Sequence, residues 1–131
     1  MVDYFSSLQG HQFISLTTFR RTGVAVATPV WFAEVGGRLY VTTDPDAGKV
    51  KRIRHTARVT VAPCTFSGQT LGPALEGWAR LLTPAEYGAA EAALKAKYGL
   101  QWTLLTLPDR LRRRAAQRTF LEITPPGEGS D

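Results

Sequence analysis

The chain has 131 residues, the size of a single domain, and 44% of them are hydrophobic, as in an ordinary globular protein. Its apolar runs are too short to span a bilayer and its first residues form no signal peptide, so we expect a cytoplasmic protein without membrane contact. A single cysteine excludes an internal disulfide, two histidines argue against a zinc cage, and a net charge of +5 favours an anionic partner.

The first half of the chain is predicted to form a short helix, a run of β-strands and a second helix. The strand at 24–35 has small residues opposite larger ones on two apolar faces, which indicates cover on both sides, in a closed barrel or at a subunit interface. Gly36-Gly37 is typical of a two-residue hairpin turn. The expected elements are a helix at 4–9, strands at 13–19, 24–35 and 38–43, and a helix at 49–56.

The second half contains the clearest local signal, a helix start at Thr83. Threonine at the N-cap, Pro84 at the first helical position and Glu86 three residues after the cap form a capping box. An apolar stripe of Tyr87, Ala90, Leu94 and Tyr98 follows at helical spacing, and Gly99 ends the helix. The other expected elements are strands at 58–64, 74–82 and 119–124 and a helix at 108–117.

About six strands, mostly joined by hairpins, and a few peripheral helices predict a β-barrel of the mainly-β α+β class. We assign residues 1–124 to one domain. The tail at 125–131 consists of Pro, Gly, Ser and two acids, a composition typical of disorder.

The sequence lacks several motifs that would by themselves indicate a nucleotide-binding or catalytic site. There is no G-x-G-x-x-G, no complete phosphate-binding loop around Gly48-Lys49, no G-x-S-x-G and no paired-carboxylate pattern. We therefore identify no catalytic residue and no metal ligand, and expect any difficult chemistry to come from a cofactor.

The helix predicted after residue 48 begins with a cluster of cations. Lys49, Lys51 and Arg52 occupy its first turn, where the helix dipole and unpaired N–H groups already favour negative charge. A bound anion such as a phosphate group would turn this arrangement into a binding site. The alternative is that Asp44 and Asp46 neutralise the cations on a solvated face.

Two neighbouring segments are candidates for the same ligand. Thr42 and Thr43 end the preceding strand, where their hydroxyls could bond the anion, although strand threonines are often only β-formers. A proline inside the strand at 28–31 suggests an edge or bulge whose freed backbone groups could bond a flat ring, with Trp31 either lining that pocket or lying in the core. The segment consists of Thr28, Pro29, Val30 and Trp31.

A nucleic-acid interface is the remote alternative. It rests on the net charge and on the run Arg112-Arg113-Arg114, which is more typical of a solvated helix face.

Taken in order, several blocks of the chain resemble the pyridoxamine-5′-phosphate-oxidase-like split β-barrel flavoproteins, and most closely the branch that uses the deazaflavin coenzyme F-420. The similarity covers about residues 8–82. The blocks are Phe13–Phe19, Gly23, Thr28–Phe32, Leu39–Thr43, Gly48–Arg54, Arg58-Val59 and Glu76–Arg80.

The resemblance implies an FMN-binding type of split barrel that works as a homodimer with cofactor sites at the subunit interface. In such folds the strand matching Thr28 to Trp31 lies along the isoalloxazine-type ring. The segments matching Thr42-Thr43 and Lys49, Lys51 and Arg52 hold the phosphate.

Two departures from the family pattern limit what the resemblance implies. Pyridoxamine-phosphate oxidases carry a Ser-Arg-Lys block where this chain has Ala47-Gly48-Lys49, and their carboxy-terminal substrate-binding block is not recognisable here. The sequence therefore leaves both the substrate and the choice between FMN and F-420 open.

The leading hypothesis is an oxidoreductase that moves a hydride between a bound flavin or deazaflavin and a small organic substrate. The alternative is a non-catalytic flavin or haem carrier on the same barrel.

Overall fold

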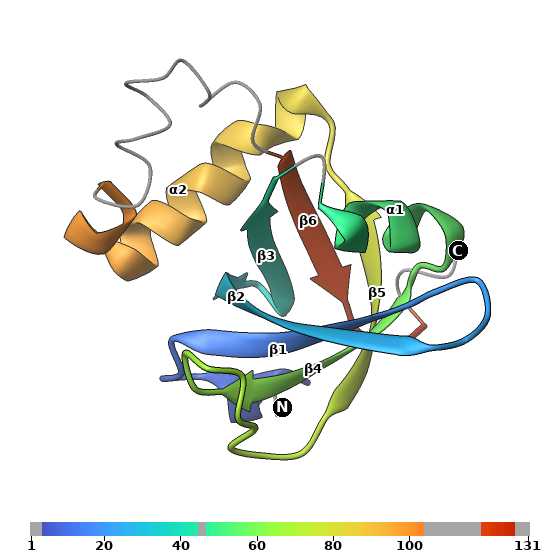
Figure 1. The fold of residues 1–131 in the computed structure, drawn as a ribbon. Helices are drawn as coiled ribbons and strands as arrows, with labels where there is room; N and C mark the ends of the chain where they lie inside the picture. The colour runs from blue at the N-terminus through green and yellow to red at the C-terminus, as the bar shows by residue number, and fades with distance from the viewer. Residues whose placement is uncertain (1–3, 45–46, 104–118, 128–131) are drawn as a thin grey trace.

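A computed structural model describes residues 4–44, 47–103 and 119–127. Six antiparallel strands close into a barrel in the order β1-β2-β3-β6-β5-β4 (Figure 1), which confirms the predicted fold class. The strands are β1 (Phe13–Phe19), β2 (Ala25–Val35), β3 (Arg38–Thr43), β4 (Arg58–Cys64), β5 (Leu75–Leu81) and β6 (Thr119–Thr124). Each predicted strand is present, with ends that differ by no more than one residue.

The tight turn between β2 and β3 follows from two glycines. Gly36 and Gly37 have φ angles of 60° and 81°, a left-handed conformation that costs glycine little. Their hairpin sets Val35 opposite Arg38 and fixes the register of both strands.

β2 is the longest strand and changes its neighbours along its length. All of Ala25–Trp31 pairs with β1, whereas pairing with β3 covers only Phe32–Val35. No described strand pairs with the second edge of β2 over Ala25–Trp31. The barrel is therefore split beside this half of β2. Both faces were expected to be covered along the whole strand. Among the described residues such cover is found only near Phe32 and Ala33, and residues 25–29 are at least partly exposed.

Alternation along the strands produces two separate apolar cores. One fills the barrel interior with inward side chains such as Ile14, Leu16 and Val41. The other lies outside the barrel under helix α2, where Leu94, Tyr98 and Trp102 pack on outward residues of the sheet.

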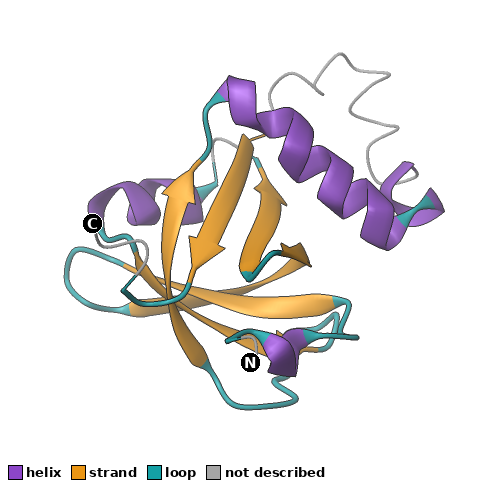
Figure 2. Cartoon of the chain, turned by 180° about the vertical axis from the view of Figure 1, so that it is seen from behind, coloured by secondary structure: helices purple, strands orange, loops and turns teal. Residues whose placement is uncertain are grey.

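Four helical segments with described bounds lie around the barrel, and a further helical stretch begins at residues 100–103 (Figure 2). The two longer ones, α1 and α2, lie on different sides of the barrel in both views. None of the described helices combines the length and the apolar character needed to cross a bilayer. The segments are η1 (Ser6–Leu8), α1 (Gly48–His55), η2 (Pro84–Glu86) and α2 (Tyr87–Tyr98). The predicted helix at 108–117 and the last four residues of the predicted tail lie outside the described residues.

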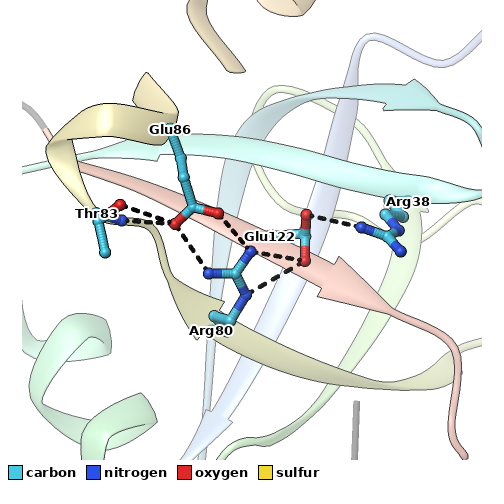
Figure 3. A network of polar contacts seen from close by, with 5 residues as sticks. All are labelled: Arg38, Arg80, Thr83, Glu86 and Glu122. Atoms are coloured by element: carbon cyan, nitrogen blue, oxygen red, sulfur yellow. Dashed lines mark hydrogen bonds and ion pairs between the residues drawn. The ribbon is translucent and has the colours of Figure 1, made fainter. Parts of the chain in front are cut away.

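The predicted capping box at Thr83 is confirmed, and its glutamate also serves a second purpose. Glu86 accepts two hydrogen bonds from the guanidinium of Arg80, at 3.0 and 2.8 Å (Figure 3). The same guanidinium contacts Glu122 on β6, which also pairs with Arg38 at 3.5 Å. A chain of alternating charges therefore ties the start of η2 to three strands.

The bond with Arg80, helped by the backbone N–H of Thr83, lowers the pKa of Glu86 from 4.5 to about 2. A carboxylate whose pKa is lowered by folding stabilises the folded state above the ordinary value, and this contribution disappears as the pH falls towards 2. We expect Glu86→Gln to lower the melting temperature most above pH 4.5 and progressively less as the pH falls to 2, because glutamine preserves the capping box but not the ion pair. Melting curves of both proteins from pH 2 to 7 measure this difference. A difference that does not change with pH would contradict the assignment.

Candidate functional site

Helix α1 closes one end of the barrel and carries the predicted cations. Val50 and Ile53 are buried, and Ile53 belongs to the interior core, as the helical spacing predicted. The N-cap residue, Ala47, supplies no side-chain cap, and no acid lies in the first turn. The positive end of the helix dipole thus lacks its usual partners.

Two cations of α1 reach hydroxyl groups on inward-facing threonines of two strands. The amine of Lys49 donates to the hydroxyl oxygen of Thr43 on β3 at 3.2 Å. The guanidinium of Arg52 donates through Nε to the hydroxyl oxygen of Thr18 on β1. We call these four residues the basic cluster. No ion pair links either cation to a carboxylate of the described residues.

The surroundings of Lys49 disfavour its positive charge. Burial lowers its pKa, the nearby charge of Arg52 lowers it further, and Asp44 opposes both effects. A negatively charged ligand placed between the two cations would relieve this repulsion. The cluster is therefore better suited to an anion than to an empty, solvated surface.

Gly48 leaves room for one of the two cations. A Cβ atom at this position would lie 2.7 Å from Nη1 of Arg52, closer than side-chain contacts allow. The guanidinium therefore folds back over Gly48 at the start of α1. A larger residue here would require the guanidinium end of Arg52 to shift.

The remaining predicted phosphate contacts are arranged differently. Lys51 is exposed, and it makes no hydrogen bond or ion pair within the described part of the chain. Thr42 is buried but lies on the opposite face of β3 from Thr43, because side chains alternate along a strand. Of the five predicted phosphate contacts, the structure thus places three in the basic cluster, namely Lys49, Arg52 and Thr43. Thr42 and Lys51 lie outside it.

The four ring-contact candidates divide between the two faces of β2. Thr28 and Val30 pair with the inward residues Leu16 and Ile14, and Val30 is buried. Pro29 is exposed on the outer face. The strand pairs here only with β1 among the described strands, which agrees with the edge that the proline predicted.

Trp31 joins a row of aromatic rings on the outside of the barrel. Its ring is stacked on Tyr98 of α2 with centroids 4.2 Å apart, and Phe13 lies at 6.4 Å on its other side. Phe66 extends the row at 5.8 Å from Phe13 and is 80% exposed. Trp31 is therefore half-buried and packs at the edge of the core under α2. The sequence left open whether it lines a pocket or lies in the core, and its position is intermediate between the two.

Thr18 is the one member of the basic cluster that sequence reasoning missed. A signal was available, because Ile14, Leu16 and Thr18 alternate on the interior face of β1, which places a hydroxyl at the end of a buried row. What could not be predicted is that α1 crosses this end of β1 and brings Arg52 to it.

A comparison with family models identifies the class of protein that this fold and site define. The model described as "Pyridoxamine 5'-phosphate oxidase" matches residues 4–127. The chain belongs to this family, as its resemblance predicted. Among curated proteins, none matches the sequence.

Solved structures share the fold at low sequence identity. The protein Atu2129 of unknown function from Agrobacterium tumefaciens has a TM-score of 0.68 and 18% identity, with 95% of this chain covered but only 54% of that one, so the chain spans about half its length. An FAD-binding protein from Mesorhizobium loti has a TM-score of 0.62 and 17% identity, and the match covers 91% of this chain and 84% of that one. A protein described as an F420 reductase has a TM-score of 0.59 and 20% identity, covering 95% and 94%.

The close approach of Arg52 to Gly48 gives a direct test of the basic cluster. We expect inorganic phosphate to raise the melting temperature of the protein more than chloride does at equal ionic strength. Gly48→Ala should reduce this difference, because the added methyl group requires the guanidinium to shift.

Gly88→Ala on α2 is the matched control, because a Cβ there meets nothing within 4 Å. This variant should retain the full phosphate effect. An equal response of the wild type and Gly48→Ala would show that Arg52 does not contribute to anion binding.

Proposed function

We propose that this protein is a flavin- or deazaflavin-dependent oxidoreductase that moves a hydride between the bound cofactor and a small organic substrate. The family and the fold support a flavin-type cofactor in general. The observation that carries the proposal for this chain is the basic cluster, in which Lys49 and Arg52 bond threonine hydroxyls and make no ion pair with a described carboxylate, beside the uncapped start of α1.

FMN and F-420 both join an anionic phosphate-bearing chain to a flat tricyclic ring, and the residues present fit the anionic part. Two cations, two threonine hydroxyls and the first N–H groups of α1 supply donors, and a phosphate group accepts such donors through several oxygens. We therefore assign the phosphate to Lys49, Arg52, Thr43 and Thr18. Lys51 and Thr42 remain secondary candidates.

The position of β2 supports placing the ring along its unpaired half. Thr18 of the basic cluster lies opposite Val26 in the β1–β2 register, and Thr28 follows two residues further along β2. At about 3.3 Å per residue, this step is ~7 Å, comparable with the reach of a short sugar-alcohol chain. Backbone groups at 28–31 that β3 does not engage would then be available to the ring edge.

A bound flavin or deazaflavin would supply the hydride chemistry. The chain's own residues would hold the phosphate, orient the ring against β2 and exclude water from it. No described side chain is assigned as a proton donor, and the substrate is assigned only as a small organic molecule.

A homodimer is part of the proposal, and an exposed apolar surface supports it. Pro29 is exposed on the unpaired part of β2, and Phe66 is 80% exposed. The loop carrying Phe66 packs on Pro29, since a Cβ on Gly68 would be 3.9 Å from the proline Cδ. A second copy seated here would cover the apolar side chains next to the proposed ring position.

Cofactor titration tests the function. We expect purified protein to bind FMN or F-420 with a change in the absorbance or fluorescence of the cofactor. Lys49→Ala should weaken binding by about 10- to 100-fold, because it removes a charge-assisted bond worth roughly 1.5–3 kcal/mol. Arg54→Ala, which removes an exposed cation from the last turn of the same helix, should change the affinity by less than threefold.

The outcomes distinguish the alternatives. Binding without turnover of any reduced cofactor would favour a carrier, and a Soret band in freshly purified protein would favour haem. Absence of binding to both FMN and F-420 would overturn the proposal. Steeply salt-dependent binding to nucleic acid would favour the remote alternative, whose arginine run at 112–114 lies outside the described residues.

The dimer is tested by a charge placed in the apolar surface. We expect the wild type to sediment as a dimer and Ala27→Glu to shift the equilibrium to monomer, because the exposed alanine lies on the unpaired half of β2. Ala92→Glu, an exposed alanine on α2, is the control and should leave the mass unchanged. Analytical ultracentrifugation measures both, and a monomeric wild type would contradict this part of the proposal.

A further inference from the structure

A hollow in the surface lies between the segment at 8–12, the end of β2 and helix α2. Its main part has a volume of about 380 Å³ and is walled mostly by apolar side chains and backbone. A smaller hollow of about 200 Å³ adjoins it, and Lys97 lines both. Neither cation of the basic cluster lines this groove. Helix α2, which forms one of its walls, lies on a different side of the barrel from α1 (Figure 1).

Lys97 is the one lysine or arginine among the described residues that line the groove, and His11 lines its smaller part. Although Lys97 as a whole is exposed, its amine lies 3.3 Å from the centroid of the buried Phe32 ring and 5.2 Å from that of Tyr98. Within the described residues this amine makes no ion pair. Burial lowers its pKa from 10.5 to about 8.

The carboxylate in the described lining, Glu34, is already bonded to other groups. Glu34 accepts the backbone N–H of Gly37 at 3.1 Å, in the turn between β2 and β3, and the side-chain amide of Gln9 at 3.5 Å. It thus stabilises the hairpin turn and the rim of the groove. The amine of Lys97 instead rests on an aromatic face, with cation–π attraction as its only described charge partner.

The backbone under the groove is held firmly in place. The hydroxyl of Tyr98 accepts the N–H of Phe32 at 2.9 Å and donates to the carbonyl oxygen of Gln12 at 2.6 Å. One side chain therefore joins the end of α2, β2 and the segment at 8–12. The three walls of the groove are thereby positioned before any ligand arrives, which reduces the entropy lost on binding.

We propose that this groove is a second ligand site, which binds a small carboxylate with a flat or apolar body. The carboxylate pairs with the amine of Lys97, and the body packs on the wall formed by Ala33, Ala93 and Ala96. Burial disfavours the positive charge of the amine, and a bound anion would stabilise that charge. The apolar wall favours an organic acid over inorganic phosphate. The site goes beyond the proposed cofactor function and does not depend on it.

Titration with benzoate, followed by backbone amide NMR shifts, tests the site. We expect saturable shifts at Gly10, Phe32, Ala93 and Ala96. Lys97→Met, which keeps the length of the side chain but not its charge, should weaken benzoate binding at least fivefold. Lys95→Met, two residues earlier and exposed on the same helix, should bind benzoate like the wild type.

Benzamide serves as the uncharged probe of the same shape, and we expect at least fivefold weaker binding than for benzoate. Equal binding of the two probes, equal binding by Lys97→Met, or no saturable shifts in the wild type would each overturn the proposal. Thermal melting of each variant verifies folding. Because Lys49→Ala should leave benzoate binding unchanged, failure of this site and failure of the cofactor site can be told apart.

Discussion

The arrangement of this molecule depends on one strand that is longer than the neighbour it pairs with. β2 has eleven residues, but β3 pairs with only its last four, while β1 follows the rest. The mismatch leaves one edge of Ala25–Trp31 without a described partner, although backbone groups in a strand normally find one. Helix α1 closes the end of the barrel next to this unpaired edge, where it contacts Thr18 and Thr43. The proposed phosphate contacts, ring position and dimer surface all adjoin this one edge.

Local chemistry made most of the fold predictable from the sequence. Two successive glycines define the hairpin at 36–37, and the capping box at Thr83 defines the start of η2, because each signal acts within four residues. The spacing of Val50 and Ile53 likewise predicted the buried face of α1. These elements need no knowledge of distant segments.

The site was predicted only in part, because its contacts join segments far apart in the chain. Arg52 and Thr18 are 34 residues apart, and nothing near either residue indicates that α1 crosses the end of β1. In the sequence, Thr42 and Thr43 look equivalent as phosphate contacts. Because side chains alternate along β3, they lie on opposite faces of the strand. Trp31 is also placed by a distant partner, since Tyr98 lies on a helix that follows three further strands.

The cations in the two charged regions of the molecule have different kinds of partner. On the outer sheet, Arg80 lies between Glu86 and Glu122, so its charge is fully matched within the chain. In the basic cluster, Lys49 and Arg52 instead each bond a different threonine hydroxyl, and the charge of Arg52 lowers the pKa of Lys49. Surface ion pairs add little stability, but uncompensated neighbouring cations at a helix start reduce it. A fold that tolerates this arrangement is the kind expected where a ligand supplies the missing negative charge.

The departure of this chain from the family pattern at residue 48 is consistent with that interpretation. The resemblance to pyridoxamine-phosphate oxidases implies an arginine where this chain has Gly48, so one cation is missing from the start of α1. The space that a side chain would need is filled by the guanidinium of Arg52, 2.7 Å from the position of the missing Cβ. A cation from the next turn of α1 thus takes up the place left by the shorter residue. Because the charge comes from within the helix, it is anchored to Thr18 on β1 rather than carried by the loop.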